Sequence, residues 1–379
     1  MKIVFTGGGS GGHFYPIIAI AEAIHNQVRE QRLVAPKLYY VGPSAFDEQA
    51  LFGESITFIK SAAGKLRRYP SLWNITDLFV TAFGILWCLV TLFRIYPDVV
   101  VSTGGYMSVP TILAAHFLGI PIVVHESDAK PGRANLLASR YAARIAIAFD
   151  SAAAYFPKKA QPHVARTGIA VRSALWRLEP EGANQELGLD TSVPTVFIVG
   201  GSLGSKRINE TVLSALPGLV ESVNVIHQTG AAHIKEVEAT AKVILEGDRN
   251  ATRYHPVAYL SVRALQQAAG AATVVVSRAG AGTITEISLW KKPAILIPIP
   301  ESISHDQRTN AYAYAHTGAA VVIEEANLAP HLLTSEVKRI ALDKELSASM
   351  AEKGAGFADP DAAKLIAGEV LKIALSHEE

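Results

Sequence analysis

The chain opens with residues whose spacing suits phosphate binding. A β-rich run, Lys2–Thr6, leads into Gly7-Gly8-Gly9-Ser10-Gly11-Gly12-His13, and a helical pattern follows from Pro16 to His25. Glycines let backbone N–H groups approach a ligand closely, and the start of a helix adds a partial positive charge. A histidine just beyond such a loop can exchange a proton near neutral pH. The run therefore predicts a phosphate site with proton-transfer chemistry beside it.

The same glycines fit the dinucleotide fingerprint only in part. Gly7, Gly9 and Gly12 have its G-x-G-x-x-G spacing, but the fingerprint also requires an acidic residue about 20 positions later to hold a ribose. The expected second strand, 37–41, runs into Gly42-Pro43 without a carboxylate. An NAD site is thus disfavoured. A plain βα turn without a ligand is the other alternative, although these glycines exceed what a turn requires.

The composition restricts the class of protein. A chain of 379 residues predicts about two domains. Its 49% hydrophobic and 18% charged residues allow large buried cores, and the net charge of +1 gives no reason to expect a nucleic-acid partner. The single cysteine, Cys88, excludes an intrachain disulfide and a zinc knuckle. Because Met1-Lys2 leads directly into a β-rich run broken by glycines, we expect no signal peptide and a reducing cytoplasm.

Short apolar runs alternate with helical patterns, and the alternation restarts halfway along the chain. The runs predicted as buried strands are 3–6, 38–41, 56–60, 99–102, 122–125, 145–148 and 163–166, then 195–199, 223–228, 273–277, 294–297 and 320–323. This predicts two α/β units in tandem, each with a mostly parallel, doubly wound sheet. We expect the connection at Thr167–Arg172 and Glu179–Asn184, and a nucleotide-sugar site where the two sheets face each other across a cleft.

One stretch, Leu78–Phe93, is unusually apolar. It contains no charged residue but is shorter than the roughly 20 residues that a spanning helix needs. The basic and aromatic group Lys65-Leu66-Arg67-Arg68-Tyr69 lies upstream, with Trp73 close behind. Cationic residues beside an apolar helix suit docking onto an anionic membrane surface. The alternative is a core helix between two strands, and both can hold if one face points inward.

Several stretches after predicted strands carry glycines, hydroxyls and acids. They are Thr6–His13, Ser102–Tyr106, His125–Asp128, Gly200–Ser205 and Ser277–Glu286, followed by Pro298, His305, Asp306, Gln307 and Asn310. Together with Gly64–Tyr69, this set resembles the enzymes of glycosyltransferase family 28 that transfer N-acetylglucosamine from its UDP sugar to lipid-linked muramyl-pentapeptide in bacteria and so form lipid II. The resemblance covers nearly the whole chain.

The resemblance implies a GT-B fold with two Rossmann-like domains. Residues 1–165 would form the acceptor and membrane-associating domain, and 166–358 the domain that binds UDP-N-acetylglucosamine. The last helix, around Ala362–Leu375 within 360–379, would pack back on the first domain. The acceptor would be undecaprenyl-linked muramyl-pentapeptide, attacked through its C4 hydroxyl. Such a protein would be peripheral, on the cytoplasmic face of the cell membrane.

The donor would lie mainly against the second domain. Glu286 follows a glycine-rich loop at the opening of a predicted helix, where its carboxylate could take the two ribose hydroxyls; a carboxylate favoured by the helix dipole alone is the alternative. The Ser202 hydroxyl would hold the diphosphate, with a helix cap as its alternative role. The other loop residues expected at the donor are Leu203, Gly204, Gly280, Ala281, Gly282, Thr283, Ile284 and Thr285.

Three further residues match the donor side of the family. Arg172 matches the arginine that ends the interdomain segment and reaches the donor, although a surface arginine in a linker is the alternative. Gln307 matches the donor-sugar glutamine, whose amide can bond hydroxyls in both senses, although exposed glutamines without a role are frequent. Leu260 is expected where a backbone group contacts the uracil.

The family inverts the anomeric centre by direct displacement, so the acceptor hydroxyl must lose a proton as UDP leaves. His13 is our candidate for the general base, because a helix start disfavours its cationic form; a hydrogen bond to the glycine loop or a phosphate is its alternative role. Glu126, in the acceptor-side motif, is the rival base. The remaining substrate-binding candidates on this side are Ser10, Gly11, Gly12, Asp128 and Asn135.

No metal cofactor is implied, although a loosely bound Mg²⁺ is compatible with the pattern. The one Asp-x-Asp, Asp359-Pro360-Asp361, precedes the last predicted helix, where capping accounts for it. Backbone amides and Arg172 are expected to meet the charge of the leaving group instead.

The chain departs from the family pattern at two places. Asp128 ends a motif that commonly reads His-Glu-Gln-Asn, and Leu203-Gly204-Ser205 stands where Gln-Gly-Ala is common. These changes leave three alternatives open: a related lipid glycosyltransferase with another acceptor, a UDP-sugar 2-epimerase on the same fold, and a sugar-nucleotide sensor without activity. The apolar stretch and its basic neighbours count against the epimerase.

Overall fold

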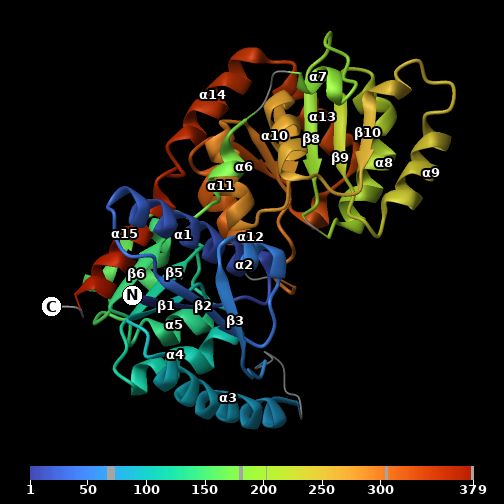
Figure 1. Cartoon of the computed structure of the whole chain (residues 1–379). Coiled ribbons are helices and arrows are strands. Elements are labelled where there is room, and N and C mark those ends of the chain that lie inside the picture. Colours follow the sequence, from blue (N-terminus) through green and yellow to red (C-terminus); the bar gives the residue numbers. More distant parts are fainter. Residues whose placement is uncertain (66–72, 179–181, 202, 304–305, 377–379) are drawn as a thin grey trace. The chain divides into compact units, whose positions relative to one another are not determined.

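The computed structural model describes the chain except for residues 66–72, 179–181, 202, 304–305 and 377–379 (Figure 1). Two compact units make up the chain. The first is Met1–Arg172 with Asp359–Glu379, and the second is Ser173–Ala358. The expected boundaries, after 165 and before 360, lie close to these divisions.

In the described residues of the first unit, seven parallel strands form one sheet in the order β3-β2-β1-β4-β5-β6-β7. The strands are β1 (Lys2–Thr6), β2 (Lys37–Gly42), β3 (Ile56–Lys60), β4 (Val99–Ser102), β5 (Ile122–Glu126), β6 (Arg144–Ile147) and β7 (Val164–Arg166). The strand order reverses direction between β1 and β4, which is the place where open parallel sheets bind ligands.

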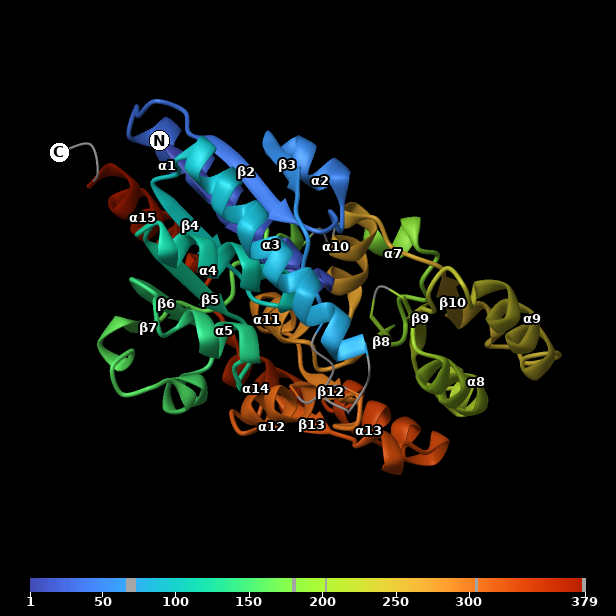
Figure 2. The ribbon, with the colours of Figure 1, turned by 90° about the horizontal axis from the view of Figure 1, so that it is seen from below.

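Helices cover both faces of this sheet, because successive strand residues point to opposite sides. Ile3 and Phe5 pack with α1 (Gly11–Glu30) and α15 (Ala362–Leu375), whereas Val4 packs on the other face. The helices on that other face are α3 (Trp73–Ile95), α4 (Val109–Phe117) and α5 (Arg133–Ala138), and α2 (Glu48–Gly53) lies beside β3 (Figure 2).

The described residues of the second unit give a six-stranded parallel sheet in the order β10-β9-β8-β11-β12-β13. Its strands are β8 (Thr195–Val199), β9 (Asn224–Gln228), β10 (Tyr254–Val257), β11 (Val274–Ser277), β12 (Ala294–Leu296) and β13 (Ala320–Val322). The sequence analysis missed β10. Its Pro256 removes a backbone donor, and proline in a strand is tolerated at an edge, which is where β10 lies.

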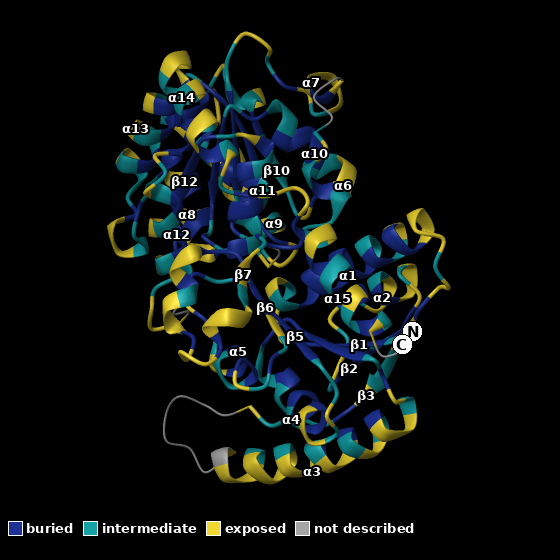
Figure 3. Cartoon of the chain, turned by 90° about the vertical axis from the view of Figure 1, so that its left-hand side faces the viewer, coloured by how far each residue is buried: buried dark blue, intermediate teal, exposed yellow. Residues whose placement is uncertain are grey.

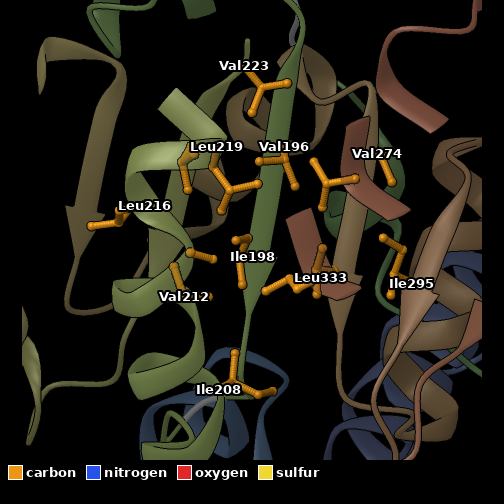
Figure 4. Packing of buried hydrophobic residues seen from close by; sticks show 14 of the residues in the cluster. Val196, Ile198, Ile208, Val212, Leu216, Leu219, Val223, Val274, Ile295 and Leu333 are labelled. Atoms are coloured by element: carbon orange, nitrogen blue, oxygen red, sulfur yellow. The ribbon is translucent and has the colours of Figure 1, made fainter. Parts of the chain in front are cut away.

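Two apolar layers enclose the second sheet. Figure 4 shows Val196 of β8 beside Leu219 of α8, and Ile198 beside Leu333, in one buried cluster. Phe197, between Val196 and Ile198 in the strand, points to the opposite layer. The helices of the first layer are α8 (Lys206–Val220), α9 (Ile234–Ile244) and α13 (Pro330–Ala341); those of the second are α10 (Val262–Ala271), α11 (Ala281–Trp290) and α12 (Gln307–Ala315). The remaining helices of this unit are α6 (Ser173–Trp176), α7 (Ala183–Glu186) and α14 (Lys344–Ala355).

Helix α3 exposes most of its apolar surface (Figure 3). Only a narrow stripe, with Gly84, Cys88 and Leu92 four residues apart, is buried against the sheet and α4. An ordinary core helix is therefore excluded for Leu78–Phe93. The segment Ile75–Ile95 has the length and hydropathy of a membrane-crossing helix, by those two criteria alone. Of the basic group upstream, Lys65 is described and exposed, and residues 66–69 lie outside the described residues.

The chain returns at its end to complete the first unit. Helix α15 packs along α1, and Gln27 Nε2 of α1 donates to the Lys364 carbonyl over 2.6 Å. Ile366 and Val370 are buried in the same apolar cluster as Ile17 and Ile24 of α1. The last helix is thus part of the first unit's core.

Ile366→Ala should lower the free energy of unfolding of the first unit by about 2–5 kcal/mol, because it removes buried methyl groups and leaves a cavity between α1 and α15. Denaturant unfolding followed by circular dichroism measures this. Leu365→Ala, on the exposed side of the same helix, is the matched control and should change the free energy by less than about 0.5 kcal/mol. Equal effects of the two substitutions would contradict this packing.

Candidate functional site

Loops at the carboxyl ends of β1 and β4 form the candidate site of the first unit. Gly7, Gly8 and Gly9 follow β1 with φ angles of +144°, +130° and +90°, which suit glycine. A Cβ on Gly105, in the loop after β4, would overlap the Gly8 carbonyl. The two loops meet at the point where the strand order reverses, and only bare backbone fits there.

Helix α1 begins at Gly11, earlier than the predicted start near Pro16. Ser10 is its N-cap residue; its carbonyl accepts from the N–H groups of His13 and Phe14, both over 3.2 Å, while its side chain makes no capping bond. The N–H groups of Gly11 and Gly12 have no acceptor within the helix, as in any first turn. Gly11 and Gly12 therefore lie in the first turn of the helix, where N–H groups favour an anion.

His13 is held by the neighbouring loop. Its Nδ1 lies 2.9 Å from the Thr103 carbonyl, and Thr103 Oγ1 donates to the His13 carbonyl over 2.5 Å. A carbonyl only accepts, so Nδ1 must carry the proton in this contact. The neutral ring then has its lone pair on Nε2, which is the form that a general base needs.

Glu126, the rival base, ends β5 with 1% of its surface exposed. Its carboxylate accepts from the N–H groups of Asp128 (2.9 Å) and Gly132 (3.1 Å) and from Asn135 Nδ2 (2.9 Å). Asn135 Nδ2 also lies 3.2 Å from the His125 carbonyl. Glu126 and Asn135 therefore organise the loop between β5 and α5, a role that the sequence analysis did not assign to them.

Two opposing influences act on the Glu126 carboxyl. Burial is the largest influence and raises the pKa of Glu126, and the negative charge of Asp128 raises it further. The three N–H donors lower the pKa, but they do not cancel the increase, and the pKa is raised to about 8. The departure from the family pattern at Asp128 therefore acts on Glu126 directly, through like charge.

Arg172 ends the first unit and lies against α1. Its guanidinium carbon is 4.7 Å from the centre of the Tyr15 ring, which is cation–π geometry. Its Nε is buried and makes no hydrogen bond within the described residues. Tyr15 thus holds the predicted donor-binding arginine in the first unit.

The second unit repeats the glycine arrangement after β8. Gly201 and Gly204 have φ angles of +95° and +77°, and a Cβ on Gly204 would overlap the Thr229 carbonyl. Leu203, between them, is exposed, and Ser202 lies outside the described residues. Ser205, which the sequence analysis did not single out as a site residue, caps α8 by accepting from the Ile208 N–H over 3.4 Å.

The loop after β11 leads into α11, with Gly280 as its N-cap residue. The N–H groups of 281–283 have no acceptor within the helix, and a helix start of this kind favours an anion. By contrast, the Ile284 N–H donates to the Gly280 carbonyl over 3.0 Å, and the Thr285 N–H belongs to the helix ladder. Ile284 and Thr285 are buried, and Thr285 Oγ1 bonds the Ala281 carbonyl. These two residues are helix and core residues, unlike the prediction.

The structure adds detail at three residues predicted for the donor. Glu286 is in the second turn of α11 rather than at its opening, and is half-buried. Gln307 Oε1 accepts from the Ile299 N–H over 3.2 Å, which fixes the orientation of the amide; Nε2 remains a donor, and the oxygen keeps a second lone pair. The Leu260 N–H is bonded to Gln228 Oε1 over 3.1 Å, which leaves the Leu260 carbonyl for a nucleobase.

Arg278 is a partly buried residue of this site without a role in the sequence analysis. Its Nη2 donates to Ser205 Oγ over 2.7 Å, its Nη1 lies 3.2 Å from the Ile297 carbonyl, and it pairs with Glu325. It therefore links the loops after β8, β11 and β12. The only signal was its place inside Ser277–Glu286.

The described residues contain no group of three or more His, Cys, Asp or Glu side chains arranged to hold a metal ion. Within Asp359-Pro360-Asp361, Asp359 Oδ1 accepts from the Asp361 N–H over 2.8 Å, whereas Asp361, the N-cap residue of α15, makes no side-chain capping bond. Asp359 therefore stabilises the turn that precedes α15, and the helix cap expected from an aspartate side chain is not formed by Asp361.

Comparison with known proteins shows the family to which the chain belongs. The N-terminal domain of glycosyltransferase family 28 matches residues 3–147, and the C-terminal domain of the same family matches 195–366. The chain belongs to glycosyltransferase family 28. Its two doubly wound parallel-sheet domains are those of the GT-B fold, as expected.

Named relatives of this family 28 chain cover nearly its whole length. It is 31% identical over 375 residues to a UDP-N-acetylglucosamine–N-acetylmuramyl-(pentapeptide) pyrophosphoryl-undecaprenol N-acetylglucosamine transferase of Treponema denticola, covering 96% of each chain. The enzyme of the same name, number 2, from Bacillus cereus is 34% identical over 347 residues, covering 91% of this chain and 93% of the relative.

Solved structures share the fold. Acinetobacter baumannii MurG superposes with a TM-score of 0.75 at 24% identity, covering 98% of this chain and 99% of that one. A UDP-GlcNAc 2-epimerase from Neisseria meningitidis gives 0.68 at 16% identity, covering 98% and 100%. At these identities the likeness shows the family 28 chain's fold and not its activity.

The proton on Glu126 makes stability depend on pH. Its pKa is about 8 in the folded chain and 4.5 as an ordinary glutamate, so the folded chain holds a proton that the unfolded chain releases. The free energy of unfolding should therefore fall as pH rises from about 4.5 to 8. Asp128→Asn lowers the pKa of Glu126 and should reduce this slope. Urea unfolding between pH 5 and 8 and carboxyl-carbon NMR titration measure both effects.

Asp150→Asn is the control, because Asp150 is exposed and pairs with Arg166. It should leave the slope and the Glu126 titration unchanged. An identical Glu126 titration in Asp128→Asn and the parent chain would contradict the charge coupling.

Proposed function

We propose that this chain transfers N-acetylglucosamine from UDP-N-acetylglucosamine to the C4 hydroxyl of undecaprenyl-linked muramyl-pentapeptide, which forms lipid II. One observation carries the proposal: relatives named for that reaction are 31–34% identical over at least 90% of this chain. Both domains of the family are present along the chain, so neither substrate-binding half is missing from the match.

The two glycine sites suggest that each unit binds a different substrate. Helix α11 offers the N–H groups of 281–283 and carries Glu286 one turn further on, an arrangement suited to the diphosphate and ribose of UDP. In the first unit, Gly11 and Gly12 start α1 beside His13, which suits the pyrophosphate and sugar of the lipid acceptor. The donor is therefore assigned to the second unit and the acceptor to the first.

The proposed chemistry is a single displacement. His13 Nε2 takes the proton of the acceptor C4 hydroxyl, and the oxygen of that hydroxyl bonds to the anomeric carbon of N-acetylglucosamine. The bond from the anomeric carbon to the UDP oxygen breaks at the same time, with inversion of the anomeric centre. UDP leaves with the electron pair, and helix N–H groups meet its charge, so we propose that no metal is required. His13 is preferred to Glu126 because the Glu126 oxygens already accept three N–H groups of the chain.

The direct test supplies the full-length protein with labelled UDP-N-acetylglucosamine and the lipid-linked muramyl-pentapeptide. Label should move to the lipid. Transfer only to another lipid, such as diacylglycerol, would replace the acceptor, and label in an epimeric UDP sugar would make the chain an epimerase. Donor binding without any turnover would identify a sensor.

His13→Asn should lower kcat at least about 100-fold, because it removes the base while its amide can still donate to the Thr103 carbonyl. Steady-state transfer assays with thermal unfolding measure this. His25→Asn, another α1 histidine, bonded to the Glu54 carbonyl, is the control and should retain kcat. Full activity of His13→Asn would eliminate His13 as the base.

We further propose that α3 docks the protein peripherally on the cytoplasmic face of the cell membrane. Leu78, Phe79, Phe83, Leu86 and Trp87 are exposed along it. Its inner stripe is packed on the protein, so the helix can lie on a bilayer without crossing it. Arg67 and Arg68 in the sequence, with the exposed Lys65, would add attraction to anionic lipids.

Replacing Phe79 and Phe83 together by Ser should release most of the protein from anionic phospholipid vesicles, because it removes two aromatic side chains from the docking face. Cosedimentation measures the bound fraction. Phe52→Ser is the matched control, since Phe52 is 86% exposed on α2 and lies outside this helix. Undiminished binding of the double variant would contradict docking through α3.

A further inference from the structure

Gln228 joins two loops of the second unit through one buried amide. It ends β9 and is 5% exposed. Its Nε2 donates to the Gly201 carbonyl over 3.3 Å, and its Oε1 accepts from the Leu260 N–H over 3.1 Å. A backbone N–H only donates and a carbonyl only accepts, so the orientation of this amide is fixed by its partners.

The two loops are those assigned to opposite ends of the donor nucleotide. Gly201 belongs to the glycine loop after β8, where its carbonyl also accepts from the Gly204 N–H over 3.1 Å. Leu260 immediately precedes Ser261, the N-cap residue of α10, in the segment expected at the uracil. Gln228 therefore lies between the part of the site for the diphosphate and the part for the base.

The surroundings leave this amide little freedom. A Cβ on Gly204 would overlap the Thr229 carbonyl, and one on Gly230 would overlap the Leu203 carbonyl, so the glycine loop rests directly on the end of β9. Asn209 Nδ2 donates to the Thr229 carbonyl over 3.0 Å from α8. The end of β9 is thus held by α8 and by the glycine loop, and the Gln228 side chain bonds to both the glycine loop and the Leu260 segment.

We propose that Gln228 is a positioning residue that sets the spacing between the nucleobase segment and the diphosphate loop, so that the site recognises a uridine diphosphate as one rigid unit. The inference rests on the proposed function, because it assumes a UDP-sugar donor in the second unit. Gln228 does not touch the donor; it acts through Gly201 and Leu260.

Gln228→Met and Gln228→Glu separate this role from simple packing. Gln228→Met keeps the side-chain volume but leaves the Leu260 N–H without its acceptor, and should raise both the Kd for UDP and the KM for UDP-N-acetylglucosamine about tenfold, with kcat at saturating donor unchanged. Gln267→Met is the matched control. Gln267 is a 4% exposed glutamine of α10 bonded to Glu186, and its replacement should leave Kd and KM unchanged.

Gln228→Glu adds a pH readout. When protonated, the glutamic acid has one donor and one acceptor, like the amide; when ionised, it sets a carboxylate against the Gly201 carbonyl. Its UDP affinity, divided by that of the parent chain at each pH, should rise toward one as pH falls from 8 to 5. Titration calorimetry with UDP measures this. Because both proteins bind the same UDP at each pH, the ratio cancels the effect of UDP ionisation on affinity.

Failure of the positioning role and failure of the proposed function would give different results. Unchanged KM and Kd in Gln228→Met, a loss confined to kcat, or a Gln228→Glu affinity ratio independent of pH would each overturn the positioning role. If Gln228→Met fails to fold, the pH dependence of Gln228→Glu still decides. Failure of the unmodified protein to bind UDP would instead refute the proposed function.

Discussion

Bare backbone at the carboxyl ends of two parallel sheets is the constraint on which the rest of the structure depends. Gly105 approaches the Gly8 carbonyl, and Gly204 approaches the Thr229 carbonyl, too closely for any side chain. The first approach joins the loops after β1 and β4, where the strand order reverses, and the second joins the loops after the neighbouring strands β8 and β9. The helix N–H groups beside them then provide a fixed partial positive charge that does not depend on the rotamer of any long side chain.

Buried and partly buried polar side chains at the strand ends bond mainly to the chain itself. Glu126 accepts three N–H groups of its own loop, Arg278 links loops after three strands, and Gln228 links two. Such groups would be costly to bury if their hydrogen bonds were incomplete. Their hydrogen bonds fix the loops to which the proposed function assigns the substrates. His13 differs, since its contact with Thr103 sets a tautomer suited to proton transfer.

Much of the fold could be predicted from the sequence, because buried parallel strands read as continuous apolar runs between glycine turns. The edge strand β10 was missed because Pro256 interrupts its pattern. Within the site, the glycine loops were predictable from local sequence, whereas Ile284 and Thr285 face inward because a helix turns neighbouring residues of one motif to different sides. The bonds of Gln228 and Arg278 join distant segments, which no local pattern reveals.

The placement of α15 has a consequence for synthesis on the ribosome. The first unit is formed mostly by residues before Ser173, but part of one layer of its core is α15, which is synthesised after the second unit. While residues 173–358 emerge, the apolar surface of α1 that later receives Ile366 and Val370 has no permanent cover. The first unit therefore cannot complete its core until the whole second unit has been synthesised, and the uncovered face of α1 is exposed to aggregation during that interval.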